Sequence, residues 1–273
     1  MLKKRLIPVI LLRNGIIVQS RNFKRYQALG SPTAAVERLS NWASDELIYL
    51  DISSTPTYDL NRDDLNHPIY STIKEIISLV SKRCNIPLTF GGGIRTLEDA
   101  ALRINLGADK ITLNTAVFEN PILIRQIAEI YGKQCVVISI DVKKEENGKY
   151  VVYKRVKEPT TYDPINFAKQ MENEGAGEIL LNSINNDGAM NGFDLELIHN
   201  VADSVKIPLI AIGGAGNWQH FEDVLSQTSA SAVAAANIFQ HTENSVFNCK
   251  KYLFDQGLNV RRPSELSNLK SNL

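Results

Sequence analysis

The sequence predicts an α/β fold, a closed (β/α)8 TIM barrel assembled from two similar half-barrels. Short apolar runs alternate with longer amphipathic segments along the 273 residues, and this pattern is typical of a parallel sheet covered by helices. Eight apolar runs occur within about 250 residues, which fits a closed barrel better than an open sheet. A third observation is an internal repeat, in which segments of the first half recur about 120 to 130 residues later.

The apolar runs are the expected barrel strands because they are short and are bounded by polar or turn-forming residues. They cover residues 6–12, 47–52, 88–90, 111–114, 136–142, 179–183, 209–212 and 232–236. The segments between them carry apolar residues at helical spacing, which predicts helices outside the barrel. These helices include residues 69–84, 97–106, 121–131, 164–174, 195–205 and 218–226. Residues 143–149 predict a hairpin tip after the fifth strand, with Asn147-Gly148 as the turn.

The internal repeat is clearest around the third and seventh strands, where residues 86–94 recur as 207–215. Residues 45–50 recur as 177–182, and residues 107–114 have a weaker echo in 230–237. Two half-barrels with equivalent glycine-rich sites indicate a ligand with two similar ends. We expect one barrel over residues 1–260 and a polar tail over residues 261–273.

Composition narrows the class of protein. Lysine plus arginine and aspartate plus glutamate number 30 each, so the net charge is zero and a polybasic nucleic-acid arm is not expected. No stretch approaches the ~20 apolar residues of a membrane span. Three cysteines lie far apart, which suits a reducing cytoplasm. No histidine pair has metal-ligand spacing, so neither a metal nor a cofactor is expected.

Glycine-rich turns follow the third and seventh strands. Glycine lets the backbone approach a ligand closely and point N–H groups at it, and barrels commonly bind phosphate at this end. Asparagines after the fourth and eighth strands belong to the same pattern. The candidate phosphate-binding residues are Gly92, Gly93, Asn114, Thr115, Gly188, Gly213, Gly214, Ala236 and Asn237. The alternative is that the glycines only form tight turns.

Three aspartates end predicted strands at the rim where barrel enzymes place their chemistry. Asp51, Asp141 and Asp187 fall at the C-terminal ends of the second, fifth and sixth strands. A carboxylate there can act as a general acid or base if its surroundings tune its pKa. The alternative is a structural carboxylate that accepts loop N–H groups, and we favour that alternative for Asp51.

Four charged residues mark the opposite end of the predicted barrel. Arg5, Glu46, Lys110 and Glu178 each come just before an apolar run. If their side chains point inward, they must pair with one another, because desolvated charges need partners. Such a ring is either a plug that closes the barrel floor or a gate for a small neutral molecule. Taken without further information, the sequence favours the plug.

Six segments, in order, resemble one family, the cyclase subunit of imidazole glycerol phosphate synthase. They are residues 5–8, 45–52, 91–96, 107–110, 175–181 and 213–216, and the resemblance runs from about residue 1 to 260. It implies a barrel that binds a bis-phosphorylated substrate across its top. It also implies a glutaminase subunit docked at the bottom as a heterodimer, and ammonia that travels through the barrel.

The resemblance implies altered chemistry at the top of this barrel. Of the family's two catalytic aspartates, the one on strand five is present as Asp141, but the one on strand one falls on Leu11. The family's active-site lysine falls on Gln19. The strand-six aspartate is kept as Asp187, whereas the threonine two residues later is Ala189. Near the second phosphate site, two family serines fall on Ile212 and Asn237.

The bottom of the barrel matches the family closely. All four charged residues correspond to the family's ammonia gate, and Asp109 corresponds to an aspartate at the glutaminase interface. The resemblance therefore favours the gate over the plug. The resemblance thus implies an intact ammonia entrance beneath a top site that lacks one of the family's proton-transferring groups.

This combination resembles a paralogue group that is associated with surface-polysaccharide gene clusters. Residues 9–15 of this chain are similar to the first strand of that group's members. That resemblance implies that ammonia from a glutaminase reaches a separate sugar amidotransferase, for acetamidino modification of a nucleotide-linked sugar. The alternatives are a genuine cyclase of histidine biosynthesis and a non-catalytic scaffold that activates the glutaminase. For the sugar-modifying subunit and for the scaffold, we expect little stand-alone cyclase activity.

The chain also departs from the family in length. Residues 53–70 are about ten residues longer than the family's loop after the second strand. The segment lies at the catalytic rim, where it is either a lid, a docking surface or a tolerated insertion, since long surface loops cost little closure entropy.

Overall fold

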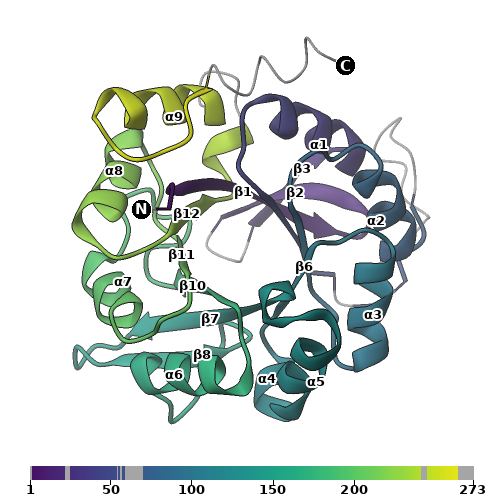
Figure 1. Ribbon diagram of the computed structural model, residues 1–273, viewed down its shortest axis with the longest axis horizontal. Helices are drawn as coiled ribbons and strands as arrows, with labels where there is room; N and C mark the ends of the chain where they lie inside the picture. The colour runs from purple at the N-terminus through teal and green to yellow at the C-terminus, as the bar shows by residue number, and fades with distance from the viewer. Residues whose placement is uncertain are drawn as a thin grey trace.

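The computed structural model describes residues 2–21, 25–53, 55, 57–58, 70–240 and 245–263. At its centre lies a closed barrel of parallel strands, with helices arranged around it (Figure 1). The barrel strands, in spatial order, are β1 (Arg5–Arg13), β4 (Leu47–Asp51), β5 (Leu88–Gly91), β6 (Lys110–Leu113), β7 (Val136–Lys144), β10 (Glu178–Ser183), β11 (Leu209–Ile212) and β12 (Ala232–Ala235). The barrel is closed because β1 pairs in parallel with both β4 and β12. The predicted (β/α)8 fold is confirmed.

The helices connect successive barrel strands and cover the outside of the barrel (Figure 1). Their bounds are α1 (Pro32–Asn41), α2 (Ile73–Ser81), α3 (Leu97–Asn105), α4 (Ala116–Glu119), α5 (Ile122–Tyr131), α6 (Pro164–Glu174), α7 (Leu195–Ala202), α8 (Trp218–Gln227) and α9 (Val246–Asp255). Two 3-10 turns, η1 (Lys133–Cys135) and η2 (Ile238–Gln240), complete the connections. Helices α1, α4 and α9 were not among the segments that the spacing predicted.

Two antiparallel extensions rise from the C-terminal ends of barrel strands. The predicted hairpin after β7 is confirmed: β8 (Tyr150–Lys154) pairs antiparallel with β7 and is followed by β9 (Glu158–Pro159). A second extension was not predicted. Strand β2 (Ile16–Arg21) folds back on β1 through a turn at Asn14-Gly15, and β3 (Arg25–Gly30) continues it.

Local sequence signals explain the helix boundaries. Thr96 caps α3 and forms a reciprocal capping box with Asp99, which satisfies backbone N–H groups that the helix leaves free. Asp163 caps α6, Pro164 occupies its first turn, and Gly175 ends it in the left-handed conformation at a φ of 110°.

Two apolar cores lie on opposite sides of the strands. The larger core fills the space between barrel and helices. The smaller core fills the barrel interior and consists of Ile7, Val9, Ile48, Val137, Leu180, Ile210, Ala232 and Ala234. Alternate residues of one strand enter different cores, as the pleat of a strand requires.

Most of the long loop over residues 53–70 and the final residues 264–273 lie outside the described residues. The helix expected from residue 69 begins at Ile73 in the structure, and residue 69 itself is not described. Within the described ranges, every helix is too short or too polar to cross a membrane.

Candidate functional site

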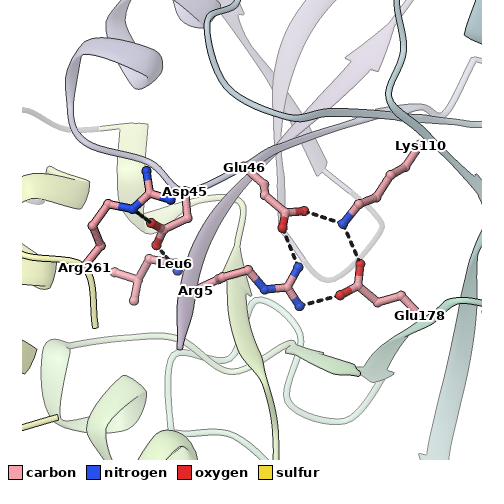
Figure 2. A network of polar contacts seen from close by, with 7 residues as sticks. All are labelled: Arg5, Leu6, Asp45, Glu46, Lys110, Glu178 and Arg261. Atoms are coloured by element: carbon pink, nitrogen blue, oxygen red, sulfur yellow. Dashed lines mark hydrogen bonds and ion pairs between the residues drawn. The ribbon is translucent and has the colours of Figure 1, made fainter. Parts of the chain in front are cut away.

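Four charged side chains converge at the N-terminal end of the barrel, and we call them the floor ring: Arg5, Glu46, Lys110 and Glu178. They come from four different strands or the residue just before one, and Figure 2 shows them pointing toward one another with cation and anion alternating. Arg5 donates hydrogen bonds to both glutamates. Lys110 Nζ lies 2.9 Å from Glu46 Oε2 and 3.0 Å from Glu178 Oε2. The ring is closed, and all four side chains predicted to meet there do so.

The floor ring is stable as ions despite its burial. The Glu46 and Glu178 side chains are only 8% and 5% exposed. Burial acts to raise the pKa of Glu46, but the charges and hydrogen bonds of Arg5 and Lys110 outweigh it, and the pKa lies below its usual range. For Lys110, burial acts to lower the pKa, and the two glutamates raise it above the usual range. Removing one member would leave its partners as uncompensated charges.

A second buried ion pair lies beside the floor ring, and the sequence analysis missed it. Lys250 is fully buried on α9, and its Nζ donates to Asp45 Oδ1 and to the carbonyl of Ala43, each at 2.7 Å. Asp45 Oδ2 accepts the backbone N–H of Leu6 at 2.8 Å, next to the floor ring (Figure 2). The signal was present, since Lys250 shares the buried face of α9 with Val246, Cys249 and Leu253. The spacing of these four residues matches one helical face.

Asp109, the residue predicted at a glutaminase interface, also lies at this end. Its Oδ2 accepts the backbone N–H of Leu88 at 2.8 Å, and its own N–H donates to the carbonyl of Leu88 at the same distance. Asp45 makes the same reciprocal pair with Leu6. Both aspartates therefore fix the starts of barrel strands.

Above the floor ring the barrel interior is uncharged, with the hydroxyl-bearing residues Thr89, Thr112 and Ser139 in register with members of the apolar interior core. The eight residues of the interior core leave no charged group between the floor ring and the upper end. Thr112 on β6 is buried in register with Val137, so its hydroxyl faces this interior. The hydroxyl oxygen of Thr112 has no hydrogen-bond partner among the described residues. An ion in such an interior would lose its hydration without compensation.

The C-terminal ends of the barrel strands form the other end of the interior, which we call the mouth. One half of the mouth is polar and centres on Asp141, which is 6% exposed and lies on β7 where that strand leaves the barrel to pair with β8. Asn182 Nδ2 donates to Asp141 Oδ1 at 2.9 Å, and Asn114 Nδ2 donates to Asp141 Oδ2 at 2.8 Å. Burial raises the pKa of Asp141, although the two amides oppose this shift. The carboxylate is thus oriented by two donors from neighbouring strands.

Asp187 follows β10 on the same half of the mouth. Burial, reinforced by the charge of Asp141, raises the pKa of Asp187 to about 6. Burial raises the pKa of both carboxyl groups, and a carboxyl group with a raised pKa in a polar cluster is a candidate for acid–base chemistry. The sequence analysis identified both aspartates but not Asn182, whose position at a strand end was its one signal.

The other half of the mouth is apolar. Leu11, Leu50, Ile212 and Ala236 pack against the top of the interior core. Leu11 stands in register with Leu50 on the adjacent strand. Gln19 lies on the hairpin strand β2, opposite Gln27 of β3. Leu11 and Ile212, two positions where the sequence departs from the resembled family, lie in this half.

The first glycine turn packs tightly on its neighbours. Gly92 has a φ of +95°, and a Cβ there would lie 2.0 Å from the carbonyl oxygen of Asp51. Gly93 has a φ of +65°, and a Cβ there would meet only the Arg103 guanidinium, at 3.5 Å. The Asn114 amide donates to Asp141 and to the carbonyl of Ser139. The phosphate role of Gly92, Gly93, Asn114 and Thr115 stays a prediction.

The second glycine turn is covered by backbone. A Cβ on Gly214 would lie 2.1 Å from the carbonyl oxygen of Gly192, whose N–H donates to the carbonyl of Gly214 at 3.0 Å. Asn237 Nδ2 donates to the carbonyl of Ser20 at 2.7 Å. The phosphate role of Gly188, Gly213, Gly214, Ala236 and Asn237 stays a prediction.

Asp51 has the structural role that we favoured. Its Oδ1 accepts the N–H of Ser53 at 2.9 Å and the hydroxyl of Ser53 at 2.5 Å, and its Oδ2 accepts the hydroxyl of Tyr58 at 2.8 Å. These bonds tie the start of the long loop to the end of β4. Gly15 of the β1–β2 turn packs against the ring of Tyr58, which would lie 3.1 Å from a Cβ.

Comparison with known proteins identifies the family of this chain. A family model described as histidine biosynthesis protein matches residues 5–245. The chain belongs to the histidine biosynthesis protein family. The match spans every barrel strand, from the floor ring residue Arg5 to beyond β12.

Two curated relatives in this family cover nearly the whole chain. A Saccharolobus solfataricus protein named imidazole glycerol phosphate synthase subunit HisF is 40% identical over 261 residues, 96% of this chain and 100% of its own length. A Vibrio vulnificus (strain YJ016) protein, provisionally named imidazole glycerol phosphate synthase subunit hisF2, is 37% identical over 266 residues, 97% of this chain and 94% of its own length. Both names describe subunits of a synthase, so the histidine biosynthesis family includes subunits of enzyme complexes.

Proposed function

We propose that the chain is the barrel subunit of a glutamine-dependent synthase complex, which receives ammonia from a glutaminase and conducts it to the mouth. The closed floor ring beneath an apolar interior is the observation that carries this proposal. The glutaminase would dock on the N-terminal end, close to Asp109. Its product would enter where the floor ring opens.

The floor ring suits a gate because of what it excludes. Ammonia is small and neutral, whereas ammonium and other ions would have to give up hydration in an apolar interior. Opening requires one of the four ion pairs to lengthen, and each pair shares its charges with another, so no ion is left unpaired. The free hydroxyl of Thr112 offers ammonia one hydrogen-bond partner on the way.

At the mouth, Asp141 and Asp187 would carry the remaining acid–base chemistry. Asp141, held by two amides, would stabilise developing positive charge, and Asp187 would exchange a proton near neutral pH. Leu11 and Gln19 cannot transfer a proton or supply a cation at positions where the resembled cyclases do. Loss of a general acid or base typically costs about 10²- to 10⁴-fold in rate, so ring closure would be slow.

In this proposal the ammonia serves a separate sugar amidotransferase, which uses it for acetamidino modification of a nucleotide-linked sugar in surface-polysaccharide biosynthesis. The resemblance of residues 9–15 to that paralogue group supports this assignment. The proposed combination of a complete gate with slow ring closure also supports this assignment, because such a gate is useful only if another enzyme consumes the ammonia.

A second candidate is a genuine cyclase of histidine biosynthesis. The name of the Saccharolobus solfataricus relative, with 40% identity over its full length, favours it, as does the presence of Asp141. In that case a different proton-transferring group must replace the one missing at Leu11. Asp187, whose pKa is raised to about 6, is the group that we would expect to transfer the proton instead.

The experiment combines the chain with its glutaminase and follows glutamine hydrolysis and nitrogen transfer. With ¹⁵N-amide glutamine and the sugar amidotransferase, we expect labelled nitrogen in the product even when unlabelled ammonium is present in excess. Glu46→Gln should lower the labelled fraction, and the matched control Glu37→Gln, in an exposed ion pair with Arg83, should not. Glutaminase stimulation without labelled transfer, unaffected by Glu46→Gln, would show a scaffold instead.

A further inference from the structure

Two aspartates hold the starts of barrel strands at the floor, and each comes directly before a member of the floor ring. Asp45 precedes Glu46, accepts the backbone N–H of Leu6 at 2.8 Å and donates its own N–H to the carbonyl of Leu6 at 3.1 Å. Asp109 precedes Lys110 and forms the same reciprocal pair with the start of β5. We call these two arrangements the floor clamps. Each floor clamp therefore lies one residue away from a charge that closes the barrel.

The two floor clamps differ in their surroundings. Asp109 is exposed, so water can solvate its charge. The side chain of Asp45 is only 4% exposed, and a carboxylate in that state needs a cation close by. Lys250 of α9 supplies this cation, because its fully buried Nζ lies 2.7 Å from Asp45 Oδ1. The buried clamp therefore depends on a charge from the last helix, whereas the exposed clamp does not.

The Asp45 clamp fixes the lower end of β1, which carries Arg5. The parallel register of β1 with β4 begins at Val9. From Arg5 to Pro8, β1 is in register with β12, its neighbour on the other side. The two hydrogen bonds between Asp45 and Leu6 therefore tie this end of β1 to the start of β4. Figure 2 shows that the tie lies beside the floor ring.

Loss of the Lys250 charge would release this tie. The Asp45 carboxylate would stay buried without its main cation, which is a costly state for an ion. Arg261 offers a replacement, since its Nε lies 3.6 Å from Asp45 Oδ1 and its side chain is 44% exposed (Figure 2). A carboxylate that turns toward Arg261 and water gives up the N–H of Leu6. The lower end of β1 would then move, and Arg5 would move with it.

We propose that Lys250 is a positioning residue of the ammonia gate, which keeps Arg5 in the floor ring by neutralising Asp45. The inference rests on the proposed function in one respect, that the floor ring is an ammonia gate. Lys250 lies outside the barrel interior and acts through Asp45 and the start of β1. Helix α9 is then part of the inlet as well as part of the helical cover.

The exchange of the Arg5 guanidinium protons with water tests this inference in the isolated full-length chain. The closed ring should slow this exchange, which NMR can follow. In Lys250→Met we expect exchange about tenfold faster or more, because the ring opens locally when the lower end of β1 is released. This measurement needs neither the glutaminase nor any substrate.

The labelled-nitrogen experiment described above gives a second readout, in the complex with the glutaminase and the sugar amidotransferase. In Lys250→Met the fraction of product nitrogen that comes from labelled glutamine should fall. The reason is that unlabelled ammonia from the solution can enter through a ring that no longer closes.

Matched variants separate positioning from stability. Leu253→Ala truncates a buried side chain on the same face of α9 and leaves the pair of Lys250 and Asp45 in place. It should destabilise the chain but leave both readouts at their wild-type values. Lys250→Arg retains the cation and should preserve most of both. Lys250→Gln keeps a neutral donor for Asp45, so it is the milder variant if Lys250→Met does not fold, and it should shift both readouts in the same direction.

Two results would overturn the positioning role. One is a folded Lys250→Met or Lys250→Gln protein with wild-type exchange and a wild-type labelled fraction, and the other is an equal change in Leu253→Ala. The outcomes also separate this inference from the proposed function. Faster Arg5 exchange in the Lys250 variants, together with a wild type that transfers no glutamine nitrogen, would overturn only the ammonia-conducting function. Normal transfer by the wild type, with both readouts unchanged in the Lys250 variants, would overturn only the positioning role.

Discussion

At the scale of single residues, burial determines how strongly the loss of one charged partner affects the stability of the protein. The Glu46 carboxylate accepts from two cations and has little contact with water, whereas Glu37 and Arg83 form a comparable pair on the surface with about half of each side chain exposed. The first arrangement cannot lose a member without leaving unpaired charge in the barrel. In the exposed pair of Glu37 and Arg83, each side chain can exchange its partner for water at little cost in free energy.

Glu46→Gln should therefore destabilise the chain by about 2–4 kcal/mol, since it breaks a buried network and leaves excess positive charge. Glu37→Gln should change the free energy of unfolding by no more than about 0.5 kcal/mol. Urea denaturation of the two variants checks this. Equal effects would mean that the floor ring is not a coupled network.

Asp187 gives a prediction for pH. A carboxyl whose folded-state pKa is about 6 binds more protons in the native than in the unfolded state between about pH 4 and 6. Its favourable contribution is therefore lost as pH rises through that window. Wild type should lose up to about 2–3 kcal/mol relative to Asp187→Asn between pH 4 and 7. Urea denaturation at a series of pH values measures this, and parallel curves for the two proteins would show an ordinary pKa.

At the scale of elements, α9 is fastened to the floor of the barrel by a buried cation. Its apolar face alone would pack on the barrel, but Lys250 adds bonds to Asp45 and to the carbonyl of Ala43. Burial acts to lower the pKa of Lys250, and the charge of Asp45 only partly offsets this. Asp45 in turn holds the start of β1 through Leu6. The last helix and the first strand therefore share one carboxylate.

Lys250→Met should cost about 3–5 kcal/mol, because the carboxylate of Asp45 stays buried without its main partner. The double variant Lys250→Met with Asp45→Asn should cost less than the sum of the two single changes, since it removes both charges together. A double-mutant cycle by urea denaturation checks this, with hydrogen exchange in α9 as a local readout. Additive single effects would contradict the direct pairing.

The turn glycines give a matched pair at the same scale. Gly92→Ala places a Cβ 2.0 Å from the carbonyl oxygen of Asp51, so β5 and β4 must separate at the mouth. Gly148→Ala has a similarly positive φ of +80° but meets nothing within 4 Å. We expect Gly148→Ala to cost about 1 kcal/mol from backbone strain alone, and Gly92→Ala to cost clearly more. Thermal denaturation that ranks them equally would mean that the turn relaxes freely.

At the scale of the whole molecule, periodicity was sufficient to predict the barrel. Eight short apolar runs gave every barrel strand, because strands buried on both faces carry continuous apolar sequence. The β2–β3 hairpin was missed because its strands interrupt the expected strand–helix order. The floor ring was predicted because its four charges stand at strand starts. The Lys250–Asp45 pair and Asn182 were not, because their partners are distant in sequence and only the folded chain brings them together.

The central claim is that a complete ammonia inlet lies beneath a mouth that has lost its ring-closing group. The most direct measurement is the rate of ring closure with the bis-phosphorylated imidazole precursor of histidine biosynthesis and saturating ammonium. We expect wild type to be at least about 10²-fold slower than the Leu11→Asp, Gln19→Lys double variant, which restores both missing groups. Turnover by the wild type as fast as, or faster than, the double variant would contradict the claim and identify the chain as a working cyclase.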